Sequence, residues 1–112
     1  MMGVYYILDE NKQPVEEPNE MKWGAFMSKV NRRVAFTKLT SSVQGKNVGH
    51  VEISTVFLGL DHQFGDGPPL LFETMVFGGP LDETQERCST WAEAEIMHEQ
   101  MIKRHVEHSW RM

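Results

Sequence analysis

Hydrophobic and polar residues change their spacing several times along the chain, and each change marks an expected element. Runs that alternate, or that are rich in β-branched and aromatic residues, are typical of strands. This pattern predicts strands at residues 4–8, 34–39, 50–60, 70–78 and 85–89. Apolar residues three and four positions apart predict a short helix over 19–30 and a longer helix that begins at residue 90.

Local signals mark where both helices begin. Asn19 is a suitable N-cap for the first helix, although Gly24 weakens its interior. Thr90 and Glu93 have the spacing of a capping box, in which hydroxyl and carboxylate each accept a hydrogen bond from a backbone N–H of the other residue. In the second helix an apolar stripe is expected to face the core, with His98 and His105 on the same side. The stripe consists of Trp91, Ala94, Met97, Met101, Ile102 and Val106.

Polar and proline-containing segments predict the connections. Residues 13–20 hold two prolines among acidic side chains, which indicates an irregular connection with Val15 in a short edge strand. Residues 40–47 read as a polar loop with Gly45 at its tip.

The two longest strands are expected to form an antiparallel hairpin through residues 61–69, which contain two glycines and two consecutive prolines. A hairpin centred near Gly65 would place Phe57 opposite Glu73, and a slip by one residue would exchange the faces. Both faces of these strands carry apolar residues, so both need cover. A second copy of the chain is one candidate for that cover, and the sequence therefore predicts self-association.

These elements predict an α+β fold in one domain over residues 1–112. We expect a small antiparallel sheet of about four or five strands, with a short N-terminal helix and one longer C-terminal helix packed on it. The length of 112 residues suits one core and is too short for two.

Charge and cysteine content narrow the function classes. A net charge of −5 argues against nucleic-acid binding, which needs clustered Lys and Arg side chains, and is compatible with a basic groove on another protein. The single cysteine, Cys88, excludes an intrachain disulfide and favours a reducing compartment. No segment has the length of a membrane span or the pattern of a signal peptide, so we expect a cytoplasmic protein.

The predicted hairpin loop carries the first candidate cluster, Asp61, His62 and Asp66. Carboxylate and imidazole side chains on an exposed turn can bind a cation, contact a ligand or move protons. Turn formation explains the same residues, because Asp before a turn commonly accepts hydrogen bonds from the backbone nearby.

Three further residues are candidates for contacting a ligand or partner. Glu73 lies within an apolar strand, where it could serve as a buried base, form a structural ion pair, or lie exposed on a sheet face that is only half covered. His98 could meet it if the last helix packs on the hairpin, although a core histidine explains the same position. Trp91 could stack on a base.

Partner contact can also come from the short helix. Met21, Trp23 and Met27 could form a surface patch there, with core packing as the alternative. The common catalytic signatures are absent from the sequence. We therefore assign no catalytic residue, metal site or cofactor.

Two segments resemble a family of small proteins encoded by tailed bacteriophages and prophages. They read STVFLGLDH at 54–62 and GPPLLFETMVFGG at 67–79. The resemblance extends over most of the chain, to residues 5–9, Trp23, 86–87, 89–91, Ala94 and His98. Cys88 stands where relatives are expected to carry an aromatic residue, which lowers the case for an essential thiol.

Three functions remain open. The resemblance implies a phage accessory protein that binds a host macromolecule, for example as an inhibitor of an anti-phage defence system such as CRISPR–Cas. The first alternative is a protein that binds a nucleotide between the hairpin loop and the last helix. The second alternative is a metal-dependent hydrolase that uses Asp61, His62 and Glu73.

Overall fold

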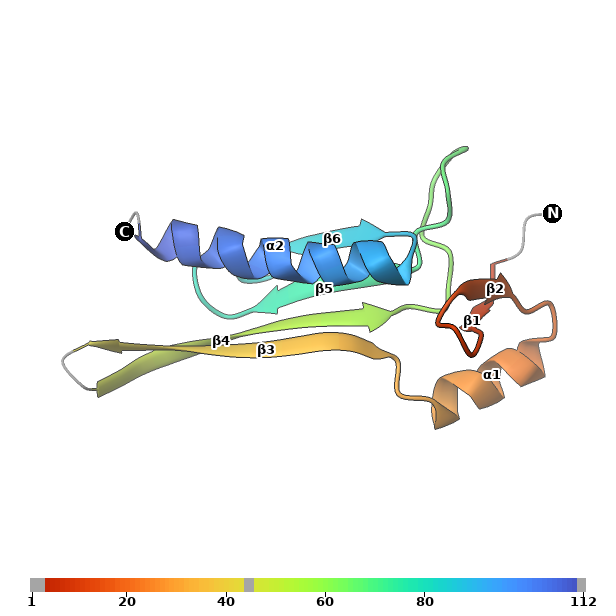
Figure 1. Ribbon diagram of the computed structural model, residues 1–112, viewed down its shortest axis with the longest axis horizontal. Helices are drawn as coiled ribbons and strands as arrows, with labels where there is room; N and C mark the ends of the chain where they lie inside the picture. Colours follow the sequence, from red (N-terminus) through yellow and green to blue (C-terminus); the bar gives the residue numbers. More distant parts are fainter. Residues whose placement is uncertain (1–3, 44–45, 111–112) are drawn as a thin grey trace.

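The computed structural model describes residues 4–43 and 46–110, which form two helices and two antiparallel sheets (Figure 1). The main sheet has the order β3–β4–β5–β6, so each strand lies beside its neighbour in the chain. Its strands are β3 Arg33–Val43, β4 Lys46–Phe57, β5 Phe72–Phe77 and β6 Gln85–Cys88. The predicted α+β fold class is confirmed.

The N-terminal segment forms a separate small layer at one end of the main sheet (Figure 1). It contains β1 Tyr6–Leu8, β2 Pro14–Glu16 and α1 Glu20–Lys29. Among the described residues, β1 and β2 form a sheet of their own, whereas the prediction placed the strands in one sheet. An isolated bridge from Tyr5 to Leu60 connects this layer to the chain that leaves β4.

Helix α2, Trp91–Trp110, lies along one face of the main sheet. Its predicted capping box is present, since Glu93 N donates to Thr90 Oγ1 at 3.1 Å and Thr90 N donates to Glu93 Oε1 at 3.1 Å. The side chains that the helix buries are spaced by three and four residues, as expected for one helical face. They are Ala94, His98, Met101 and His105.

The core divides into two apolar clusters beneath α2. Buried members of the first are Val51, Ile53, Val76 and Met101. Buried members of the second are Phe57, Leu71, Phe72 and Ala94. The strand residues of both clusters lie on the helix-facing side of the sheet, and the second cluster also reaches Leu8 of β1 and Phe26 of α1. Helix α2 extends over all four strands on this side, so the main sheet has one covered face and one open face.

The register of the central hairpin differs from the expected one by one residue. Glu73 lies opposite Val56, and Phe57 lies opposite Phe72. The expected register assumed that the two arms of the hairpin, the chain segments before and after Gly65, have equal length. Instead, Gly59 has a φ of 74° and the chain beyond it pairs with the N-terminal layer, so the arms are unequal.

Residues 40–47 were expected to form a loop, but the strands continue through most of them. β3 extends to Val43 and β4 begins at Lys46, with Thr40 paired to His50. The β-branched residues Thr40 and Val43 favour extended backbone. The predicted tip at Gly45 lies outside the described residues.

Candidate functional site

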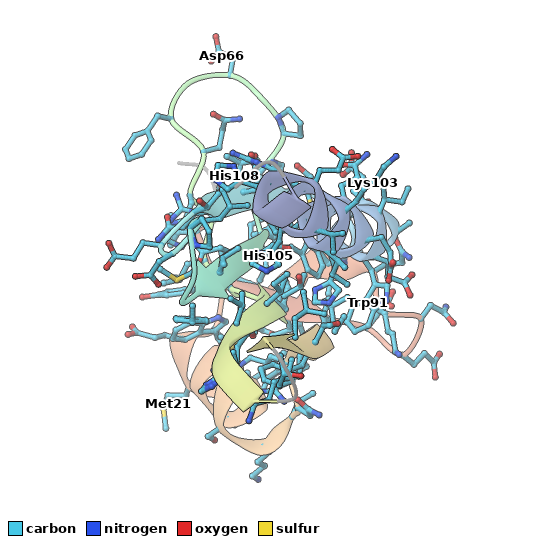
Figure 2. All side chains as sticks on the ribbon, turned by 90° about the vertical axis from the view of Figure 1, so that its left-hand side faces the viewer. Met21, Asp66, Trp91, Lys103, His105 and His108 are labelled. Carbon is cyan, nitrogen blue, oxygen red and sulfur yellow. The ribbon has the colours of Figure 1, made fainter. Side chains whose placement is uncertain are left out.

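The loop over residues 61–69 is held by its own first residue. Asp61 Oδ1 accepts hydrogen bonds from the N–H groups of Gln63, at 2.8 Å, and Leu70, at 3.1 Å. Gln63 Nε2 donates to the carbonyl oxygen of Pro68 at 3.2 Å. Asp66 lies at the apex, which projects away from the sheet and α2 (Figure 2). These contacts favour the turn-forming role of Asp61.

Glu73 forms an ion pair on the open face of the main sheet. Nε and Nη2 of Arg87 each lie 3.0 Å from Glu73 Oε2, and the Glu73 side chain is 15% exposed. The pair links neighbouring strands β5 and β6. The carboxylate thus has a cationic partner, which is the structural alternative for an acid in an apolar strand.

His98 is the centre of a buried hydrogen-bond network between α2 and three strands. Its Nε2 lies 2.9 Å from Thr37 Oγ1, and its Nδ1 lies 2.7 Å from Thr55 Oγ1. Thr55 Oγ1 lies 2.5 Å from Thr74 Oγ1. A neutral imidazole has one donor and one acceptor, so one threonine hydroxyl donates to the ring and another accepts from it. Both ring nitrogens are therefore occupied.

The pairing of Thr55 with His98 has the components of an activated nucleophile, a hydroxyl and an adjacent base. Thr55 and Thr74 are 0% exposed, and His98 is 2% exposed. A substrate has no access to a hydroxyl at that depth. We interpret the network as a structural connection that fixes α2 on the sheet, not as a catalytic centre.

His98 and Glu73 lie on opposite faces of the main sheet. Successive side chains of a strand point to opposite faces, and Thr74 contacts the His98 network while its neighbour Glu73 pairs with Arg87. The two residues that could have met in one site are thus separated by the sheet.

Two histidines make stability sensitive to acid. Burial lowers the pKa of His98, with Glu99 opposing the shift, and burial followed by the charge of His108 lowers the pKa of His105. The unfolded chain then binds protons that the folded chain does not. We expect the free energy of unfolding to be level above pH ~6.5 and to fall below it, by up to about 1.4 kcal/mol per pH unit for each histidine.

Urea titrations between pH 8 and pH 5 measure this dependence, in a range where most carboxylates stay charged. His98→Leu should reduce the slope between pH 6.5 and pH 5. The expectation is wrong if stability rises on acidification, or if the slope is the same in the variant.

Trp91 is in contact with residues from two other elements. Its ring meets Phe72 edge-on, with centroids 6.2 Å apart, and Lys12 Nζ lies 4.5 Å from the ring centroid. Lys12 comes from the turn between β1 and β2, so this cation–π contact joins the N-terminal layer to α2. One ring face that could stack on a base is occupied by Lys12.

The candidate surface residues of α1 differ in their environments. Trp23 Nε1 donates to the carbonyl oxygen of Gly59 at 3.0 Å. The ring centroids of Trp23 and Tyr5 are 4.6 Å apart. Met27 packs against the second core cluster. Met21 is 86% exposed and is the member of this set that is available to a partner.

A shallow groove runs between β6 and α2, as two adjoining hollows of about 240 and 320 Å³ that share Glu86, Met97 and Gln100. Glu86 pairs with Arg104 at 3.2 Å. Cys88 lines the larger hollow, and burial, followed by the charge of Glu93, raises the pKa of its thiol to about 11. The thiol is therefore protonated at neutral pH, which makes it a poor nucleophile.

The feature that sequence reasoning missed is the composition of the open face. Its residues follow from the observed register, in which directly opposed side chains share a face. Phe36 and Phe77 are 40% and 46% exposed there, with Met75 half-buried. The open face comprises Arg33, Phe36, Lys38, Thr40, His50, Glu52, Ser54, Val56, Glu73, Met75, Phe77, Gln85 and Arg87. The correct register of the central hairpin would have predicted which residues share this open face.

Across residues 4–43 and 46–110, no group of three or more His, Cys, Asp or Glu side chains is placed to hold a metal ion. Within the same residues, neither helix combines the length and apolar character that crossing a membrane requires. No protein-family model, curated protein or solved structure matches this chain.

Proposed function

We propose that the chain is a small non-catalytic protein that acts by binding a macromolecule through the open face of its main sheet. The observation that carries the proposal is a four-stranded sheet that α2 covers on one side, while no helix or strand of residues 4–43 and 46–110 lies over the other side. In Figure 2, α2 lies on one side of the sheet and side chains without a covering element extend from the other. Exposed apolar residues grouped on one surface are typical of interaction sites.

The chemistry of the open face suits a protein partner. Phe36 and Phe77 supply large rigid side chains, and Met75 supplies an adaptable one. Arg33 and the Glu73–Arg87 pair add charged groups around them. Aromatic residues, Met and Arg are the types enriched in protein interfaces.

The proposed partner is a host protein. The resemblance to phage-encoded proteins supports this choice. Inhibition of an anti-phage defence complex such as CRISPR–Cas is the form of this function that we propose. The protein would then act by occupying a site, which requires no reaction.

Affinity capture from bacterial lysate, followed by quantitative mass spectrometry, tests the proposal with matched variants. Phe77→Glu places a charge in the open face, while Phe64→Glu makes the same change in the loop, where Phe64 is 94% exposed. We expect wild type and Phe64→Glu to recover one common partner. The amount of that partner recovered by Phe77→Glu should be at least about tenfold lower.

Plaque formation on strains with and without a CRISPR–Cas system then tests the host target. Expression of wild type and of Phe64→Glu should restore plaques on the immune strain, and Phe77→Glu should not. Equal capture by all three proteins, or no specific capture, would contradict the proposed surface.

The two alternatives lack a supporting contact among the described residues. For a nucleotide, the loop over residues 61–69 is folded on its own backbone and Lys12 covers the ring of Trp91. For a metal-dependent hydrolase, Glu73 is paired with Arg87. We therefore develop the binding proposal alone.

A further inference from the structure

Strand β3 offers an unusually long free edge. It lies at one end of the sheet order and contains 11 residues without a proline. Between two register shifts, residues 35–41 pair regularly with β4. Edge strands are commonly protected by proline, by bulges, by short length or by charge, and within this regular stretch the only charged residue is Lys38.

The other edge of the sheet is less suited to pairing between copies. β6 has four residues, Gln85–Cys88. When two copies pair antiparallel about a two-fold axis, the axis must pass through a residue that lies opposite its own copy. If the axis passed between two residues, side chains from opposite faces of the sheet would be paired with each other. An axis through Glu86 or Arg87 of β6 would place two like charges opposite each other, which is unfavourable.

The same rule selects a register for β3. A centre at Lys38 sets two lysines against each other, which is unfavourable. A centre at Thr37 places Lys38 opposite Phe36 of the second copy, and Leu39 opposite Ala35. In this register, residues of the helix-covered face pair with residues of the same face in the second copy. Residues of the open face likewise pair with residues of the open face.

Pairing centred on Thr37 would cover the exposed edge of the open face. Phe36 is 40% exposed, with the Arg33 guanidinium 4.5 Å from its ring centroid. The methylene groups of Lys38 from the second copy would lie against this ring. The two Phe36 rings would be diagonal neighbours across the axis, a distance that aromatic side chains can bridge.

We propose that two copies of the chain associate through antiparallel pairing of their β3 edges, centred on Thr37, to form one continuous eight-stranded sheet. The two open faces then lie on the same side and form one surface. This inference goes beyond the proposed host partner and does not depend on it.

Sedimentation equilibrium over a concentration series tests the dimer with two substitutions at one position. Phe36→Lys sets a lysine opposite Lys38 twice per dimer, whereas Phe36→Glu sets a carboxylate there. Both remove the same ring. We expect wild type and Phe36→Glu to dimerise and Phe36→Lys to dissociate at least about tenfold more readily.

The double variant Phe36→Lys/Lys38→Glu should restore the dimer, because it exchanges the charges of the opposed pair. Thermal melts confirm that each variant is folded. A wild type that stays monomeric at all concentrations overturns the proposal. Equal dimerisation of Phe36→Lys and Phe36→Glu, or loss of the dimer in both, also overturns it.

Discussion

Replacing His98 by alanine is expected to destabilise the protein by about 3–5 kcal/mol, the largest effect of a single substitution that we predict. The change leaves a cavity between α2 and the sheet, where His98 is 2% exposed. It also leaves the buried hydroxyl of Thr55 and the half-buried hydroxyl of Thr37 without their imidazole partner. Equilibrium unfolding in urea measures the loss.

His108→Ala is the matched control, since His108 lies on the same helix and is exposed. It should change stability by less than about 0.5 kcal/mol. A double-mutant cycle with Thr55→Val then separates the hydrogen bond from the cavity. If His98→Ala costs no more than the control, the network does not hold α2 in place.

Gly59→Ala is expected to destabilise the protein by about 2–3 kcal/mol. Gly59 has a φ of 74°, a conformation that is strained for residues with a Cβ. An added Cβ would lie 2.5 Å from Met27 Cε and 3.2 Å from Trp23 Nε1. The substitution would therefore disturb both the backbone that leaves β4 and the side chains of α1 that pack on it.

Gly24→Ala provides the contrasting control. Gly24 lies inside α1, and a Cβ added there would meet no heavy atom within 4 Å apart from its chain neighbours and the backbone of its own helix. Higher helix propensity should make this variant equal to wild type or more stable by up to about 1 kcal/mol. Thermal unfolding compares the two variants, and equal melting temperatures for both would contradict the role assigned to Gly59.

Local signals predicted the helices well because they act within a few residues. Asn19 caps α1 through its side chain, which accepts hydrogen bonds from the N–H groups of Met21 and Lys22. Thr90 and Glu93 form the capping box at the start of α2. Such contacts need no knowledge of the rest of the fold.

The register of the strands and the buried hydrogen-bond network could not be predicted from such local signals. The one-residue shift of the central hairpin depends on Gly59, where the chain turns toward the N-terminal layer. The network joins Thr37, Thr55 and Thr74 from three strands, and each threonine taken alone suits an exposed strand position. Their arrangement around His98 depends on the register of two strand pairs, β3–β4 and β4–β5, and on the position of α2.

The arrangement of the main sheet as a simple meander also bears on how the chain folds. Its strand pairs join strands that are consecutive in the chain, so closing their loops, of which residues 58–71 are the longest, costs less chain entropy than pairing distant segments would. Helix α2 contacts all four strands and follows all of them in the sequence. The sheet can therefore assemble before α2 docks, and contacts made by His98 would then slow unfolding more than they speed folding.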